Sequence, residues 1–194
     1  MTGISRILLF MVSCVFTQNV VFVRLLGSGE AVREDRGVGA AACIGIATAA
    51  VMTLAALCGW LVRSLALVPL HAEYMTLTAL ALLCVALAYL AAAVVRGVKP
   101  ALAEKLGEGL PMIAANCAVL GVALIDLEKG ASLLDATLGG LFGGLGFLLA
   151  IVLMAGVKER IAYSKVPAPL KGLPISLISA GLVALAFMGF MGLA

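Results

Sequence analysis

The sequence predicts an all-α integral membrane protein with six transmembrane helices, arranged as two inverted three-helix repeats. Of the 194 residues, 64% are hydrophobic and 12% are charged, and the mean hydropathy of +1.22 lies far outside the range of soluble globular proteins. Six apolar stretches follow one another, and two similar segments around Asn19 and Asn116 lie half a chain length apart. We therefore expect a single membrane domain over residues 1–194, with repeat halves of about 1–97 and 98–194.

The six apolar stretches are close to the ~20 residues that a helix needs to cross the hydrocarbon core. They are expected at 4–27, 38–62, 75–95, 110–125, 133–157 and 175–193. Gln18 and Asn19 interrupt the first stretch, and the fourth is shorter than the others. We expect these two to be broken or short helices that meet near the membrane midplane. The first stretch is interpreted as a retained helix, because Ser28-Gly29-Glu30 would make a poor signal-peptide cleavage site.

The positive charges predict how the chain crosses the membrane. Ten of the 13 Lys and Arg residues fall in the first, third and fifth loops, and only Arg6, Arg63 and Lys129 fall elsewhere. Because positive loops stay in the cytoplasm, both termini are expected outside. The fifth loop, residues 157–174, is basic and rich in proline. We interpret it as a cytoplasmic connector rather than a docking surface for a soluble partner.

Glycines repeat at four-residue spacing in the fifth stretch, at Gly139, Gly140, Gly143 and Gly144. Such small residues let membrane helices approach closely. We expect this face to pack inside the chain rather than between subunits.

Few groups capable of chemistry lie inside the apolar stretches. None has a charged residue near its middle, and the chain has no nucleotide-binding glycine loop and no Ser/His/Asp set, so it is a poor candidate for an enzyme acting alone. The exceptional groups are Asn19, Asn116 and Cys117. Cys117 is interpreted either as a neutral packing thiol or as a ligand to iron. The other four cysteines lie inside apolar stretches and are expected to be structural thiols: Cys14, Cys43, Cys58 and Cys84.

Two segments resemble a known family. The run Asn-Cys-Ala-Val-Leu-Gly-Val-Ala-Leu at 116–124 and the tail Val-Pro-Ala-Pro-Leu-Lys-Gly at 166–172, continued at 179–190, are similar to the RnfA/RnfE and NqrD/NqrE family of integral membrane subunits. The resemblance spans nearly the whole chain, and the tail is closest to the A-type members. It implies a subunit of an Rnf complex in the bacterial inner membrane, paired with an RnfE-like subunit of inverted topology. Nucleic acid is not an expected partner.

The resemblance also implies a function and a cofactor. Rnf complexes couple electron transfer between ferredoxin and NAD to movement of Na⁺ or H⁺, and the paired subunits hold one [2Fe–2S] cluster, each with two cysteines. Cys117 matches one cysteine of the motif, but Gly29 stands where the other is expected. Ser28 or a partner residue then completes the cluster, or this homologue holds none. Cys14 is about four helical turns away and is an unlikely substitute. Asn19 and Asn116 are expected to bind backbone exposed at the helix breaks, with or without iron.

Other functions remain open on the sequence alone. One is a non-redox scaffold, or a small secondary transporter, derived from the same fold. A transporter is expected to carry intramembrane charges, which the apolar stretches lack. Another is an NqrE-like subunit of a Na⁺-pumping quinone reductase, which shares the fold in a related complex.

Overall fold

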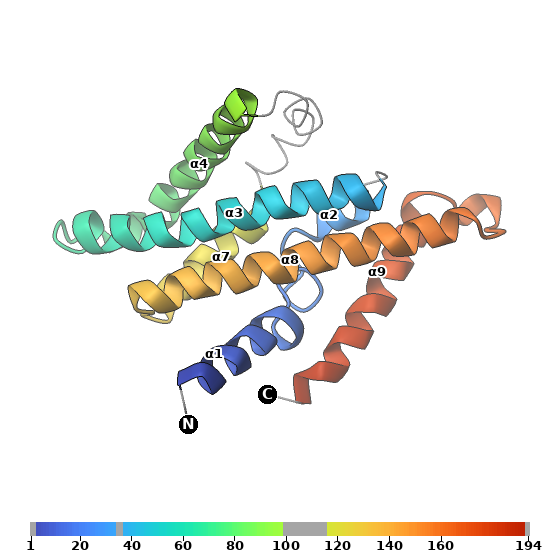
Figure 1. The fold of residues 1–194 in the computed structure, drawn as a ribbon, viewed down its shortest axis with the longest axis horizontal. Helices are drawn as coiled ribbons and strands as arrows, with labels where there is room; N and C mark the ends of the chain where they lie inside the picture. The colour runs from blue at the N-terminus through green and yellow to red at the C-terminus, as the bar shows by residue number, and fades with distance from the viewer. Residues whose placement is uncertain (1–2, 34–36, 99–115, 193–194) are drawn as a thin grey trace. The chain divides into compact units, whose positions relative to one another are not determined.

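The computed structural model describes residues 3–33, 37–98 and 116–192, and over these ranges its regular elements are all helical (Figure 1). Short π-helical or 3₁₀ turns, labelled η, continue or connect several of the α-helices. The elements in chain order are α1 (Gly3–Val12), η1 (Ser13–Thr17), α2 (Ser28–Arg33), α3 (Val38–Val62), η2 (Arg63–Leu67), η3 (Glu73–Met75), α4 (Thr76–Val98), α7 (Cys117–Glu128), α8 (Leu133–Ala162), η4 (Ala168–Leu170), α9 (Leu173–Met188) and η5 (Gly189–Gly192).

Within the described ranges, three helical stretches are long and apolar enough to cross a membrane, namely Val38–Leu67, Glu73–Ala91 and Leu133–Ala162. Ser5–Thr17 and Leu173–Met188 are shorter apolar helices. The prediction of an all-helical protein with apolar membrane spans is therefore confirmed for the described residues. The count of six spans and the inverted repeat stay predictions.

Two helices continue well beyond the ends of the expected spans. The second span continues past Val62 through Arg63 to Leu67, and the fifth continues past Val157 through Lys158 to Ala162. A charged residue ends an apolar span but not a helix, because the backbone hydrogen bonds do not depend on the polarity of the side chain. For the expected fourth span, residues 110–115 lie outside the described residues.

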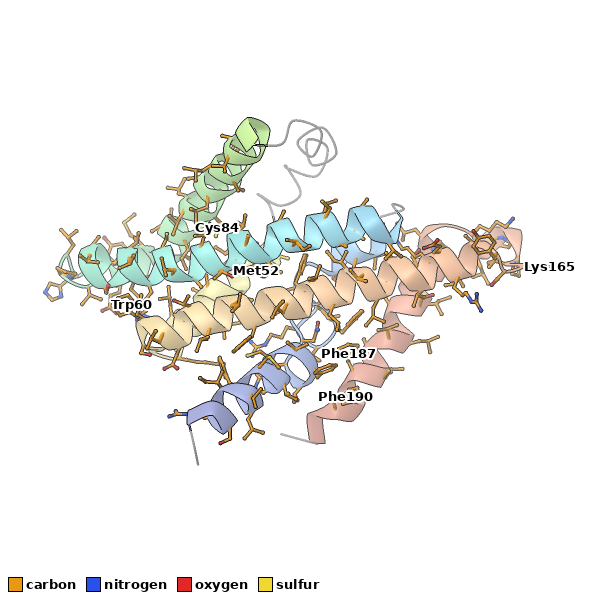
Figure 2. The ribbon with its side chains drawn as sticks, in the orientation of Figure 1. Met52, Trp60, Cys84, Lys165, Phe187 and Phe190 are labelled. Carbon is orange, nitrogen blue, oxygen red and sulfur yellow. The ribbon has the colours of Figure 1, made fainter. Side chains whose placement is uncertain are left out.

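The chain divides into two compact units, one of residues 1–45 and 145–194 and the other of residues 46–144. In the first unit, aromatic rings join the broken first span to the end of α9. Phe187 lies 6.4 Å from Phe16 and 4.8 Å from Phe22 between ring centroids. Phe190 in η5 lies 6.2 Å from Phe187 and 5.7 Å from Phe16 (Figure 2). These contacts hold the chain on both sides of the break against one helix end.

In the second unit, glycines of α8 pack closely on α3. A Cβ atom added at Gly140 would come within 2.7 Å of the Ala56 Cβ, and one at Gly144 within 2.8 Å of the Ala49 Cα. Only glycine allows this approach, so the predicted glycine face is confirmed as a contact inside the chain. Beside it, α4 and α7 share a small apolar core of Leu80, Ala123 and Leu127.

Candidate functional site

Asn19 lies at the break of the first apolar span, directly after the π-helical turn η1 and Gln18. Its side chain is completely buried, and its Oδ1 accepts hydrogen bonds from the backbone N–H of Val21 (3.0 Å) and Phe22 (3.2 Å). Its Nδ2 donates to the carbonyl oxygens of Val15 (2.8 Å) and Gly146 (3.1 Å). One amide therefore satisfies backbone groups before the break, after it, and on α8.

The backbone of Asn19 adds to this arrangement. Its carbonyl accepts from the N–H groups of Val23 (3.0 Å) and Arg24 (3.2 Å). The turn then passes through Leu25 and Gly27, both at positive φ (57° and 72°), before α2 begins. Such hydrogen bonding lets non-helical backbone persist inside a membrane protein, where water is not available to replace it.

Asn116 performs a related task in the second unit. It is the N-cap residue of α7, it is 5% exposed, and its Oδ1 accepts from the backbone N–H of Ala118 at 2.8 Å. This is the usual cap for the first N–H groups of a helix, which have no acceptor within the helix. Both asparagines thus bind backbone at a helix end, as the sequence predicts. Their part in holding a cofactor stays a prediction.

Cys117 is the first residue of α7, and its side chain is exposed. It therefore does not pack as a core thiol of its own unit, unlike Cys84, which is buried in α4. The N-terminal end of a helix carries a partial positive charge that stabilises nearby negative groups. An exposed thiol at this position is accessible to an electron-deficient or anionic centre, of which another subunit supplies a part.

Gly29 occupies the position of the second expected cysteine. It lies in the first turn of α2, it is exposed, and a Cβ atom added there would meet no other atom within 4 Å. Packing therefore does not require a glycine at this position. The neighbouring Ser28, a proposed substitute, donates its hydroxyl to the carbonyl of Leu25 at 3.0 Å.

The thiols of this chain do not fit the share of a four-thiolate cluster that the resemblance implies. At the two matched positions the chain has one thiol, Cys117, and no side chain at Gly29. Among the described residues, no group of three or more His, Cys, Asp or Glu side chains comes together as a metal site. A centre at this place would need its remaining ligands from a partner.

Asp126 is the buried ionisable residue that the sequence reasoning missed. It is 9% exposed on α7, and it lies against Gly139 of α8, where an added Cβ would come within 2.8 Å of the carboxyl carbon. It lies just beyond residue 125, where the fourth expected stretch ends, because α7 continues to Glu128, so the expectation that no charged residue lies near the middle of a stretch does not cover it. Helical spacing was the available signal: Val119, Val122 and Asp126 share the buried face of α7.

Two side chains of α3 and η2 hold the C-terminal end of α7. Trp60 donates its indole N–H to the carbonyl of Ala131 at 2.9 Å, and the Arg63 guanidinium donates to the carbonyl of Leu127. Leu127 lies in the last turn of α7 and Ala131 lies in the connection just after it, so both bonds tie this end of the helix to α3 and η2. They fix the element that carries Asn116 and Cys117 at its other end.

Comparison with known proteins gives consistent matches. The family model described as "Rnf-Nqr subunit, membrane protein" matches residues 7–194. Relatives described as the A-type subunit of the ion-translocating oxidoreductase complex are similar over almost the whole length. Those from Sodalis glossinidius and Citrobacter koseri are 41% and 42% identical over 186 residues, which is 96% of each chain. That from Syntrophotalea carbinolica is 40% identical over 189 residues, covering 97% of this chain and 98% of the relative.

Proposed function

Because this chain belongs to the Rnf-Nqr family of membrane-protein subunits, we propose that it works in an Rnf-type complex that couples electron transfer between ferredoxin and NAD to translocation of Na⁺ or H⁺. The support is the similarity over 96% of the chain to subunits of ion-translocating oxidoreductases. We place it in the bacterial inner membrane beside an RnfE-like subunit of inverted topology. The distribution of Lys and Arg supports both termini outside.

The position of Cys117 is the observation that carries the redox part of this proposal. The thiol is exposed at the start of α7, where the Asn116 cap fixes the backbone. We propose that Cys117 is the point at which this subunit meets an electron-transfer centre shared with its partner, a [2Fe–2S] cluster by resemblance. Because Gly29 supplies no second thiol, we derive no electron-transfer step through such a cluster from this chain.

The test compares Cys117→Ala with Cys58→Ala, a half-buried cysteine of α3. Both variants replace the chromosomal copy, and membranes are assayed for ferredoxin-dependent NAD reduction and for the ion gradient that it builds. We expect Cys117→Ala to lower both by about tenfold or more, since loss of groups that merely support a metal ligand already costs ~10-fold. Cys58→Ala should keep both activities, and both complexes should assemble.

A second candidate, a non-redox scaffold or small transporter of the same fold, is favoured by one observation, the missing thiol at Gly29. The same strains separate it from the first. A scaffold predicts full activity with Cys117→Ala and loss of complex assembly when the whole subunit is deleted. If deletion leaves ferredoxin-dependent activity unchanged, the chain does not belong to that complex, and assay of Na⁺-dependent quinone reduction then tests the NqrE-like alternative.

A further inference from the structure

A cavity of about 340 Å³ lies in the first unit, between the last turns of α8 and the first turn of α9. Lys158 and Lys171 line it with their ammonium-bearing side chains, and Ser164 and Ser176 add hydroxyl groups. Ile161 and Ile175 belong to its apolar wall. The cavity thus combines positive charge, hydrogen-bond donors and an apolar surface at the ends of two apolar helices.

The two lysines reach this cavity from different elements. Lys158 lies on α8 and donates to the carbonyl of Val32 in α2, which ties its ammonium group to the first unit. Lys171 is exposed in the connection between the helices. Directly after it, Gly172 adopts φ 87°, which turns the chain into α9. Among the described residues that line the cavity, none is acidic, and the exposed Lys171 brings its positive charge to the lining.

The first turn of α9 adds polar groups that favour an anion. Leu173 and Ile175 have backbone N–H groups there without an acceptor inside the helix, Pro174 has none to donate, and the helix dipole places partial positive charge at this end. Ser176 donates its hydroxyl to the carbonyl of Gly172 at 3.1 Å, so its oxygen keeps a capacity to accept. A phosphate oxygen is the ligand that Lys ammonium groups and helix N–H groups both recognise.

The apolar part of the lining distinguishes a lipid from a soluble anion. Inorganic phosphate has no apolar surface to place against Ile161 and Ile175. A phospholipid has both parts, a charged phosphodiester and acyl chains. On α9 the apolar side chains of Leu173 and Leu177 are 57% and 52% exposed, so acyl chains would have an apolar helix surface to follow. Basic pockets at the ends of membrane helices are suited to such headgroups.

We propose that this cavity binds the phosphate headgroup of an anionic phospholipid, with its acyl chains on α9. The lipid would bridge α8 and α9 at the membrane interface, independently of Cys117. The fifth loop is then a lipid-binding element and not only the connector that the sequence suggests.

The test uses the purified complex in nanodiscs that contain phosphatidylglycerol and phosphatidylcholine, with the retained lipid measured by mass spectrometry. Lys171→Gln removes one cavity charge. Lys165→Gln is the matched control, because Lys165 (Figure 2) is exposed in the same connection and is not among the residues that line the cavity. We expect Lys171→Gln to lower the retained phosphatidylglycerol about fivefold, the effect of one basic residue near an anionic lipid, and Lys165→Gln to leave it unchanged.

Three results would overturn the proposal. Equal losses in the two variants would indicate general charge attraction rather than a site. No loss with Lys171→Gln would mean that the cavity does not hold the lipid. Displacement of phosphatidylglycerol by excess inorganic phosphate would identify a soluble anion as the ligand. A thermal unfolding scan of each complex confirms that neither variant disturbs the fold.

Discussion

The two asparagine-centred segments use the same chemistry on different backbone groups. Asn19 makes hydrogen bonds to four backbone groups, on its own segment and on α8, and its break has no cysteine at Gly29. Asn116 caps one helix through Ala118 and stands beside an exposed cysteine. The sequence motif contains both an asparagine and a cysteine, and the comparison of the two segments indicates that these residues have separate roles. The asparagine stabilises the helix break, and we propose that the cysteine, where present, serves a cofactor.

The largest effect should come from Asn19→Ala. This change leaves the N–H groups of Val21 and Phe22 without their acceptor in a buried place, and we expect the free energy of unfolding to fall by about 3 kcal/mol. Thermal unfolding of the purified complex measures it. The control is Gln18→Ala, an exposed neighbour whose side chain accepts a hydrogen bond from Arg24, with an expected change within about 0.5 kcal/mol. Similar losses for both variants would contradict the role given to Asn19.

Gly139→Ala should cause a smaller loss in the free energy of unfolding. It tests whether packing holds the C-terminal end of α7 in place, opposite the Asn116 cap. The new Cβ would collide with the Asp126 carboxylate, and we expect a destabilisation of about 2 kcal/mol. Gly156→Ala on the same helix is the matched control, because its Cβ would meet no atom within 4 Å. A stabilisation by Gly139→Ala, as helix propensity alone would give, would show that α7 and α8 do not pack in this way.

Asn116→Ala removes the acceptor of the Ala118 N–H group, and a lost N-cap usually costs about 1 kcal/mol. Its unfolding is measured beside that of Asn19→Ala in the same complex. A change within about 0.5 kcal/mol, as at an ordinary surface position, would contradict the capping role.

Gly29→Cys should have the smallest effect on stability, within about 0.5 kcal/mol, since the position is open. If the missing thiol limits the cofactor, iron and acid-labile sulfide per complex should rise. Gly37→Cys, also at an exposed and open glycine, controls for an added thiol and should leave both unchanged. Unchanged iron in Gly29→Cys would show that the missing thiol does not limit the cofactor content.

The sequence is most informative where a polar residue interrupts an apolar run. Gln18 and Asn19 predict the break after η1, and Asn116 predicts the start of a helix, because an amide inside an apolar segment needs backbone partners. The exposure of Cys117 is not predictable in this way, since a thiol is equally compatible with an apolar core.

Hydropathy is less informative about where helices end. It ends the fifth span before Lys158 and the fourth before Asp126, although both helices continue. A charged residue lowers the hydropathy of a window without breaking a hydrogen bond of the helix. The burial of Asp126 depends on the missing side chain at Gly139, a contact between residues of two helices that neither segment reveals alone.

The most direct test of the account is the iron and acid-labile sulfide content of the purified complex, with EPR spectra after reduction, in wild type, Cys117→Ala and Cys58→Ala. We predict a [2Fe–2S] signal in wild type that is lost in Cys117→Ala and unchanged in Cys58→Ala. All three complexes should have the same subunit composition. Identical iron content and spectra in wild type and Cys117→Ala would contradict the assignment of Cys117 to a shared electron-transfer centre.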